Sequence, residues 1–244
     1  MSAVRFDRVS KAFGPLKVLD DISFEIPVGG AFCLLGRSGT GKSVTLRHIL
    51  GLVHPDSGKV FVEDRDIAAL ARQELVDVRK HMGFLFQNAA LFDSMSVGDN
   101  VAFPMRRHTN WSGAEIRERA TQKLADVGLE DDFDKMPGDL SGGMKKRAGL
   151  ARAMALDPPI LLVDEPSAGL DPITTREIDD LLVKTKQRGT TLVVVTHNIP
   201  SARLLGDRFA VLEDGRMLAS GTLAELDASD EPLVQAFMSS QGGG

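Results

Sequence analysis

A glycine-rich segment that ends in lysine and serine, GRSGTGKS, carries the clearest chemistry in this sequence. It has the spacing of a phosphate-binding loop, with one glycine, four further residues, and then Gly41, Lys42 and Ser43. Glycines let backbone N–H groups converge on phosphate oxygens, and the helix that follows presents its positive end to the same anion. We therefore expect Lys42 to reach the β- and γ-phosphates of a nucleotide and the Ser43 hydroxyl to ligate magnesium. The residues expected to bind the nucleotide in this segment are Gly36, Arg37, Ser38, Gly39, Thr40, Gly41, Lys42, Ser43 and Thr45.

An acidic pair, Asp164 and Glu165, directly follows the apolar run ILLV, which indicates a buried strand. Asp164 suits magnesium, directly or through a second shell, and Glu165 is placed to polarise the water that attacks a γ-phosphate. The alternative is that the pair begins a surface loop. The alternative for the glycine-rich segment is a plain turn with an exposed lysine, which the apolar run before it and the helical pattern after it disfavour.

The composition limits the classes of protein to consider. The chain has 244 residues, of which 43% are hydrophobic and 26% charged, as in a folded protein with one large domain or a domain with an insertion. Its 29 basic and 34 acidic residues give a formal net charge of −5, which argues against a general nucleic-acid binder because binding phosphates needs a basic surface. The single cysteine, Cys33, cannot form an internal disulfide. The N-terminus lacks the apolar core of a signal peptide and the apolar runs are too short to span a bilayer, so we expect a cytosolic chain that reaches a membrane only through a partner.

An α/β fold with a helical insertion is needed to position these residues, and the sequence pattern predicts one. Between about residues 88 and 138 the strand signals vanish, and residues 113–127 have the apolar spacing of one helical face. Ser112 is the expected N-cap of that helix, and Gly128 is expected to end it. Further helices are predicted over 42–52 and 172–187. Strands are predicted over residues 4–9, 22–27, 31–35, 59–63, 82–86, 160–163, 191–196, 208–213 and 216–220.

A second glycine turn, LSGGM at residues 140–144, precedes a helix that begins with Lys145, Lys146 and Arg147. Ser141 can N-cap that helix, and the two glycines leave its first N–H groups exposed to an anion. Taken alone, this segment fits a simple capped helix equally well. The order GRSGTGKS, LSGG and ILLVDEP, however, resembles that of the ATP-binding subunits of ABC transporters, almost from end to end.

The resemblance implies a P-loop NTPase core of the ABC type with an N-terminal antiparallel β subdomain and a helical insertion. Residues 1–87 and 139–244 would form the ATP-binding core with its β subdomain, residues 88–138 the insertion, and residues 225–244 a short helical tail. Two copies would sandwich two ATP molecules, each ATP touching the LSGG turn of the opposite chain. The resemblance implies a catalytic role for Glu165, His197 and Gln87, and Gln87 would also contact ATP. Magnesium would be bound by Ser43, Gln87 and Asp164. The residues that would contact the ATP of the opposite chain are Ser141, Gly142, Gly143 and Asp171.

Two residues depart from the family pattern. The aromatic residue that stacks on adenine is commonly tyrosine, but this chain has none, so Phe13 is the candidate. The alternative for Phe13 is a place in the core. The fifth residue of the LSGG turn is Met144 instead of the usual glutamine, which puts a polar contact near the opposite nucleotide's sugar in doubt.

Three longer segments resemble the ATPases of MCE-type lipid transporters, most closely the Mla (maintenance of lipid asymmetry) system. These segments are LSGGMKKRAGLARAMALDPPILLVDEPSAGLDPIT, FLFQNAALFDSMSVGDNVAFPMRRHT (residues 84–109) and EPLVQAF. This resemblance implies phospholipid transport between the two membranes of a Gram-negative envelope. It also implies a membrane permease, a periplasmic MCE protein and a small STAS-domain subunit as partners, with the ATPase on the cytoplasmic face of the inner membrane. The alternatives are another ABC importer or exporter, a soluble ABC protein of repair or translation, and a regulator without catalysis, against which the intact Lys42, Glu165 and His197 argue.

A docking surface for the permease is expected directly after Gln87, which would sit at the hinge between the ATP core and the insertion. The residues after Gln87 lack the alternation of a strand, and several should stay partly exposed. As a group they fit an apolar groove for a short permease helix, with a small core of the insertion as the alternative. These residues are Leu91, Phe92, Met95, Val97, Val101 and Phe103.

Overall fold

The N-terminal sheet is antiparallel and forms a layer of its own. In the computed structural model, which describes residues 2–37 and 39–239, β1 (Ser2–Phe13) pairs with β2 (Leu16–Pro27) on one side and with β4 (Ser57–Val62) on the other. The short strand β5 (Arg65–Asp66) completes the order β2-β1-β4-β5. Buried and exposed residues alternate along the second half of β2, because one face of this sheet packs on the rest of the protein and the other faces water.

The second sheet is parallel except at one edge, and its strand order is β10-β9-β3-β8-β7-β6. All residues of β3 and β8 are buried, as in parallel strands that are covered on both faces. At the edge, β10 turns back on β9 through Asp214 and Gly215, whose φ angles of 47° and 76° suit a tight hairpin turn. The strands are β3 (Ala31–Leu35), β6 (Met82–Leu85), β7 (Ile160–Asp164), β8 (Thr191–Thr196), β9 (Arg208–Glu213) and β10 (Arg216–Gly221).

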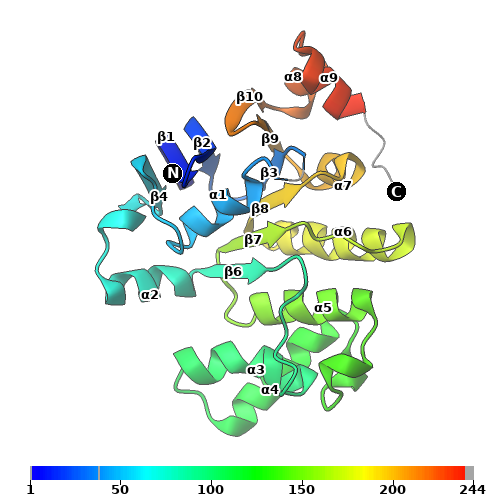
Figure 1. The fold of residues 1–244 in the computed structure, drawn as a ribbon. Coiled ribbons are helices and arrows are strands. Elements are labelled where there is room, and N and C mark those ends of the chain that lie inside the picture. The colour runs from blue at the N-terminus through cyan, green and yellow to red at the C-terminus, as the bar shows by residue number, and fades with distance from the viewer. Residues whose placement is uncertain (1, 38, 240–244) are drawn as a thin grey trace.

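Helices cover the parallel sheet and form the two ends of the molecule (Figure 1). α3 and α4 lie at one end, below α5, while α8 and α9 lie at the other end beside β9 and β10. None of the helices in the described ranges is long and apolar enough to cross a bilayer. The helices are α1 (Lys42–Ile49), α2 (Arg72–Lys80), α3 (Val97–His108), α4 (Gly113–Ala125), α5 (Gly142–Ala153), α6 (Pro172–Gln187), α7 (Ile199–Leu205), α8 (Leu223–Asp227) and α9 (Pro232–Ser239), with 3₁₀ turns η1 (Ile67–Ala69), η2 (Glu130–Asp132) and η3 (Pro137–Asp139).

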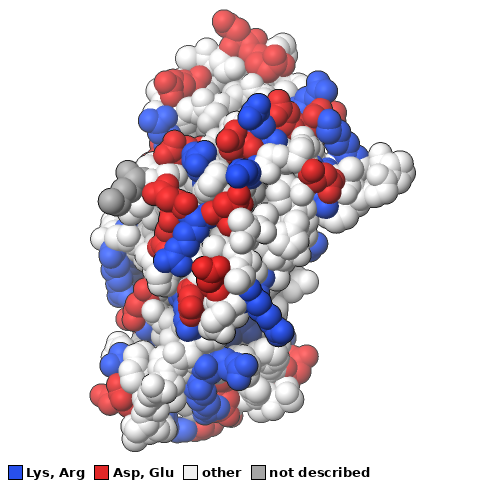
Figure 2. Space-filling model, turned by 90° about the vertical axis from the view of Figure 1, so that its left-hand side faces the viewer, with Lys and Arg blue, Asp and Glu red and all other residues white. Residues whose placement is uncertain are grey.

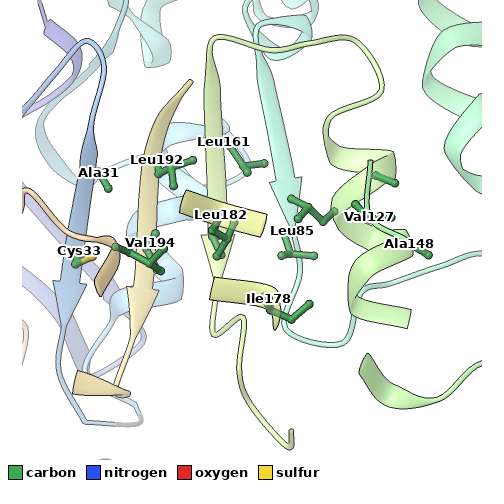
Figure 3. Close-up of a cluster of buried hydrophobic side chains, with 14 of the residues drawn as sticks. Ala31, Cys33, Leu85, Val127, Ala148, Leu161, Ile178, Leu182, Leu192 and Val194 are labelled. Atoms are coloured by element: carbon green, nitrogen blue, oxygen red, sulfur yellow. The ribbon is translucent and has the colours of Figure 1, made fainter. Parts of the chain in front are cut away.

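The parallel sheet separates two apolar clusters, because side chains alternate across it. Along β7, Leu161 and Val163 point into one cluster and Ile160 and Leu162 into the other. The first cluster joins the sheet to α3, α4, α5, α6 and α7, and part of it is drawn in Figure 3, where Leu182 of α6 lies against the strands. The second cluster joins the sheet to α1 and the N-terminal sheet. β3 and α1, which lie on either side of the glycine-rich loop in the sequence, are thus held by this packing.

The predicted fold class, α/β with an antiparallel N-terminal sheet and a helical region, is confirmed. Ser112 is the N-cap of α4, since its hydroxyl accepts the Glu115 N–H at 3.2 Å. The helix predicted over 42–52 ends earlier, at Ile49, because Gly51 has a φ of 62°. β1 and β2 are longer than predicted. Their pairing continues past several register shifts into polar residues, where the sequence has no strand pattern.

A buried amide, Asn100 of α3, fixes the segment between β6 and α3. Its side chain is fully buried. Its Oδ1 accepts the Phe92 N–H at 2.7 Å, and its Nδ2 lies 3.1 Å from the Phe92 carbonyl oxygen. The same Nδ2 donates to the carbonyls of Met95 and Ser96. One side chain therefore binds backbone groups of Phe92, Met95 and Ser96 at once, and the Phe92 N–H and the Met95 carbonyl belong to no strand or helix.

We predict that Asn100→Ala lowers the free energy of unfolding by about 2 kcal/mol or more, because buried backbone groups lose their partners. The melting temperature should fall by about 2–4 °C for each kcal/mol lost. Calorimetry of both proteins measures this, with the exposed Asn110→Ala in the same region as the control. Equal melting temperatures for wild type and Asn100→Ala would contradict the role given to this amide.

Candidate functional site

The glycine-rich loop runs from the end of β3 to the start of α1, and two of its glycines are required by its packing. A Cβ on Gly36 would lie 2.3 Å from the Leu212 carbonyl oxygen. Gly41 has a φ of 100°, and a Cβ there would lie 2.7 Å from the Val18 carbonyl oxygen. Ser38, one of the predicted ATP-binding residues, lies outside the described residues.

Lys42 is buried at the centre of this loop, with 5% of its surface exposed. Its Nζ donates to the carbonyls of Gly36 and Arg37, at 2.8 Å each, and lies 3.5 Å from Oε1 of Glu165. Burial lowers the pKa of Lys42, while the carboxylate of Glu165 opposes that shift. The loop thus holds an ammonium group at the point where the sequence predicts the phosphates.

Asp164, the last residue of β7, lies beside the first turn of α1. The Ser43 hydroxyl donates to Oδ1 of Asp164 at 2.9 Å. Burial raises the pKa of Asp164, and the hydrogen bond from Ser43 works against this rise. A hydroxyl and a carboxylate are the oxygen ligands that Mg²⁺ prefers, and Mg²⁺ commonly takes only one or two protein groups and completes its shell with phosphate and water. The pair therefore fits the predicted magnesium site.

Glu165 and His197 come from neighbouring strand ends and contact each other. Oε2 of Glu165 lies 2.9 Å from Nδ1 of His197 and accepts the His197 backbone N–H at 3.3 Å. Only 8% of Glu165 is exposed. Its carboxylate therefore lies between the imidazole on one side and Lys42 on the other, which fixes its orientation.

These groups line a cleft of about 310 Å³, together with Phe13 and Gln87. The cleft brings together residues that follow β3, β6, β7 and β8 with Phe13 of β1 and Val18 of β2. Phe13 is 47% exposed, so the alternative of a core residue is wrong, and its stacking role stays a prediction. Val18 was not predicted from the sequence, because an isolated valine on a strand gives no chemical signal. The lining residues are Phe13, Val18, Gly39, Gly41, Lys42, Ser43, Val44, Gln87, Glu165 and His197.

Three predicted ATP-binding residues face away from this cleft or lie at its rim. Thr45 is buried, and its hydroxyl points back to the Gly41 carbonyl at 3.4 Å. Arg37 is exposed and lies 3.7 Å from Glu213. The Thr40 hydroxyl donates to the Arg37 carbonyl at 2.9 Å. Direct contact of these three side chains with a nucleotide remains a prediction.

The LSGG turn and Asp171 lie together, but outside the cleft of their own chain. The Ser141 hydroxyl caps α5 by accepting the Met144 N–H at 3.2 Å, as predicted. Asp171 caps α6, and a Cβ on Gly143 would lie 2.3 Å from Cγ2 of Thr174 in the first turn of α6. Gly142 is exposed beside them. Met144 packs against the main apolar cluster, which accounts for an apolar residue at this position.

A buried acid, Asp179 of α6, is not among the residues that line the cleft and has no signal in the sequence. Its Oδ2 accepts the Ser201 hydroxyl at 2.7 Å, and its Oδ1 has no partner among the described residues. Burial raises the pKa of Asp179 to about 6. Asn198 accepts the Ser201 N–H and donates to the Ser167 hydroxyl, so these side chains connect α6 to the residues after β7 and β8. The sequence gives no signal for a contact between residues this far apart.

We predict that Asp179→Asn stabilises the protein above pH 6 relative to the wild type. A carboxyl with a raised pKa favours the folded state only while it is protonated, so the wild type loses this contribution as the pH rises from 3.8 to about 6. The asparagine variant has no such loss, and the difference in unfolding free energy should grow across that window and then level off. Urea unfolding at a series of pH values measures it, with the exposed Asp180→Asn as the control. A difference that does not change with pH would refute the assignment.

Comparison with known proteins identifies the family. The family model described as "ABC transporter" matches residues 19–168. The "Probable ribonucleotide transport ATP-binding protein mkl" of Mycobacterium tuberculosis is 43% identical over 97% of this chain, which spans 66% of that protein, just under two thirds of its length. The "Methionine import ATP-binding protein MetN" of Bradyrhizobium diazoefficiens is 40% identical, and the match covers 96% of this chain and 70% of the length of MetN. The "Intermembrane phospholipid transport system ATP-binding protein MlaF" of Escherichia coli is 39% identical, and the match covers 94% of this chain and 86% of the length of MlaF.

The fold agrees with a solved structure of the same family. The dimeric post-hydrolysis state of the ATP-binding cassette MJ0796, bound to ADP and Pi, superposes with a TM-score of 0.83 at 34% identity, over 90% of this chain and 98% of that one. The family model covers more than half of the chain and all three relatives exceed 30% identity. The chain therefore belongs to the ABC transporter family, as one of its ATPases.

Proposed function

We propose that this protein hydrolyses ATP to energise phospholipid transport between the inner and outer membranes of a Gram-negative envelope. It would act at the cytoplasmic face of the inner membrane, held there by a permease, with a periplasmic MCE protein and a small STAS-domain subunit as further partners. The observation that carries the ATPase part is the cleft in which the Glu165 carboxylate lies between Lys42 and His197. The lipid part is supported by the LSGGM and EPLVQAF segments and by the relative named for phospholipid transport.

The reaction follows from the residues of the cleft. A water oxygen attacks the γ-phosphorus of ATP, the bond to the oxygen that bridges the β- and γ-phosphates breaks, and ADP and phosphate leave. Glu165 takes the proton of that water, and His197 orients the carboxylate. Lys42 stabilises charge on the β- and γ-phosphates, and Phe13 stacks on the base. Ser43, Asp164 and Gln87 would hold Mg²⁺, which would neutralise part of the phosphate charge.

A second copy of the chain completes each ATP site in this proposal. Ser141, Gly142, Gly143 and Asp171 lie at the start of two helices, where N–H groups favour an anion, yet they do not line the cleft of their own chain. A partner copy can bring them to the nucleotide, in line with the dimer described for MJ0796.

The ATP site does not select the cargo, since relatives of similar identity are named for ribonucleotide, methionine and phospholipid transport. Transfer of labelled phospholipid between vesicles, with the ATPase and its permease reconstituted together, tests the lipid assignment. Uptake of labelled methionine and of labelled ribonucleotide are the two competing measurements. If methionine or ribonucleotide is transferred in an ATP-dependent way and lipid is not, the proposal that phospholipid is the cargo is wrong.

A groove of about 1290 Å³ between α2, β6 and α3 is the proposed site for a helix of the permease. Phe92 and Phe103, 43% and 39% exposed, pack against each other there at 5.1 Å between ring centroids. The expected surface needs a correction: Val97 and Val101 are fully buried, because with Met105 they form the inner face of α3.

The groove is basic, although the chain as a whole is acidic. Its charged lining residues among those described are Arg72, Arg79, Lys80, Arg107 and Arg152, with no aspartate or glutamate. Acidic and basic side chains are interspersed over much of the face shown in Figure 2. Arg72 and Arg107 make no ion pair with a described residue, so we expect the permease helix to carry carboxylates beside its apolar side chains.

We predict that Glu165→Gln abolishes most ATP turnover, by about 10²–10⁴-fold, because the amide cannot accept the proton of the attacking water. ATP binding should persist, since Glu165 is not assigned to the phosphates, and ATP should then trap the closed dimer. Lys42→Ala is the contrasting variant, in which ATP affinity itself falls because a charge-assisted contact is lost. Turnover of Glu165→Gln close to that of the wild type, measured by phosphate release, would exclude Glu165 as the base.

We predict that Phe92→Ser and Arg107→Glu each weaken assembly with the permease and leave the basal ATPase activity of the isolated chain nearly unchanged. The first removes an apolar contact of the groove and the second reverses one of its charges. Co-purification with the permease from solubilised membranes is the measurement, with the exposed Arg208→Glu as the matched charge control. Normal assembly of both variants would show that the docking surface lies elsewhere. Unfolding of Phe92→Ser would show that the Phe92 side chain is part of the core.

A further inference from the structure

Lys146 of α5 is a buried lysine without an acidic partner. Only 4% of it is exposed, and it makes no ion pair with a described residue. Its Nζ donates to the backbone carbonyl of Glu165 at 3.0 Å. Burial lowers the pKa of Lys146 to about 8, with the charges of Asp164 and Glu165 acting against the shift. Such a group costs stability, since a well-packed apolar side chain of similar size avoids the loss of hydration.

The backbone that Lys146 holds is strained. Glu165 has a φ of 44°, in the left-handed region that residues other than glycine rarely adopt. A conformation of this kind persists only where the surroundings enforce it. Here the Glu165 N–H donates to the Val195 carbonyl of β8 at 2.8 Å, and the Glu165 carbonyl accepts from Lys146 and, at 3.2 Å, from the Ala168 N–H. Both sides of the residue are therefore fixed, one by β8 and the other by α5.

We infer that Lys146 is a positioning residue for ATP hydrolysis, which holds the strained backbone of Glu165 so that its carboxylate points at the attacking water. The inference rests on the proposed role of Glu165 as the base. Lys146 is not itself one of the residues that line the cleft, and its contact with the lining is the hydrogen bond to the Glu165 backbone carbonyl. Lys146 lies on α5, five residues after Ser141. Its bond therefore connects Glu165 to the helix that begins at the turn proposed to contact the ATP of the second copy.

Lys146→Met tests this, because methionine fills similar space and cannot donate. We expect kcat for ATP hydrolysis to fall by about 10- to 100-fold, as for other residues that orient a reacting group. KM for ATP and the affinity for the non-hydrolysable analogue AMP-PNP should stay near their wild-type values, since the phosphate contacts are untouched. The melting temperature should be unchanged or higher, because a buried charge is removed. Lys146→Arg, which keeps a charged donor, should recover most of the turnover.

Combination with Glu165→Gln separates positioning from a general effect on the fold. Once the carboxylate is absent, Lys146→Met should cause no further loss of turnover. The exposed Lys184→Met on α6 is the matched control and should leave kcat unchanged. Should Lys146→Met be insoluble, Lys146→Gln takes its place with the same expectations for kcat, KM and the double variant.

Three outcomes overturn the inference. The first is a wild-type kcat for Lys146→Met, and the second is a further loss in the Glu165→Gln background of the same size as in the wild type. The third is a loss of turnover that follows a fall in melting temperature and is not recovered by Lys146→Arg. If Glu165→Gln alone retains turnover, the proposed base is wrong, and that failure is distinguished because it is seen before any Lys146 variant is made.

Discussion

Lys42 and Glu165 bury an ammonium and a carboxylate 3.5 Å apart, at the end of a parallel sheet. Removing two charges from water costs several kcal/mol for each, and their attraction offsets this only if hydrogen bonds satisfy the remaining donors and acceptors. The carbonyls of Gly36 and Arg37 do this for the ammonium, and His197 does it for the carboxylate. The cleft therefore holds its charged groups desolvated and oriented, as stabilisation of a phosphoryl transition state requires.

The sheet topology supplies these partners. The order β3-β8-β7-β6 places four parallel strands side by side, so the residues that follow them meet at one edge. In register, Leu35 pairs with Thr196, Val163 with Val194, and Leu85 with Val163. The glycine loop, His197, Glu165 and Gln87 each follow one of these strands. Apolar layers on both faces of the sheet fix the strands, so the spacing of the site is set by the core.

The sequence predicts the parts of this arrangement that depend on local pattern. The loop, the acidic pair, and the caps Ser112 and Ser141 follow from residue types at fixed spacing, and the structure has the caps where they were expected. Contacts between distant residues have no such signature. The bonds of Lys146 to the Glu165 carbonyl and of Ser201 to Asp179 join residues 19 and 22 positions apart, and only the packing of whole elements creates them. The apolar residues after Gln87 predict one partly exposed surface when taken together, but Val97 and Val101 are four residues apart, which is the spacing of one face of α3, and that face is buried.

α5 is the element through which the separate regions contact one another. Its twelve residues, about 18 Å in length, begin at the turn proposed to meet the second copy's ATP. In the middle, Lys146 holds the Glu165 carbonyl. At the far end, Arg152 donates to the carbonyls of Ala89 and Ala90, both at 2.7 Å, and its guanidinium lies 5.9 Å from the ring centroid of Phe92 in the groove. Ala89 and Ala90 have φ angles of 57° and 52°, so this turn after Gln87 is also strained and held from α5. A helix is stiff along its axis, and therefore a shift of α5 at the proposed interface with a second copy would displace the Glu165 backbone and the proposed permease groove together.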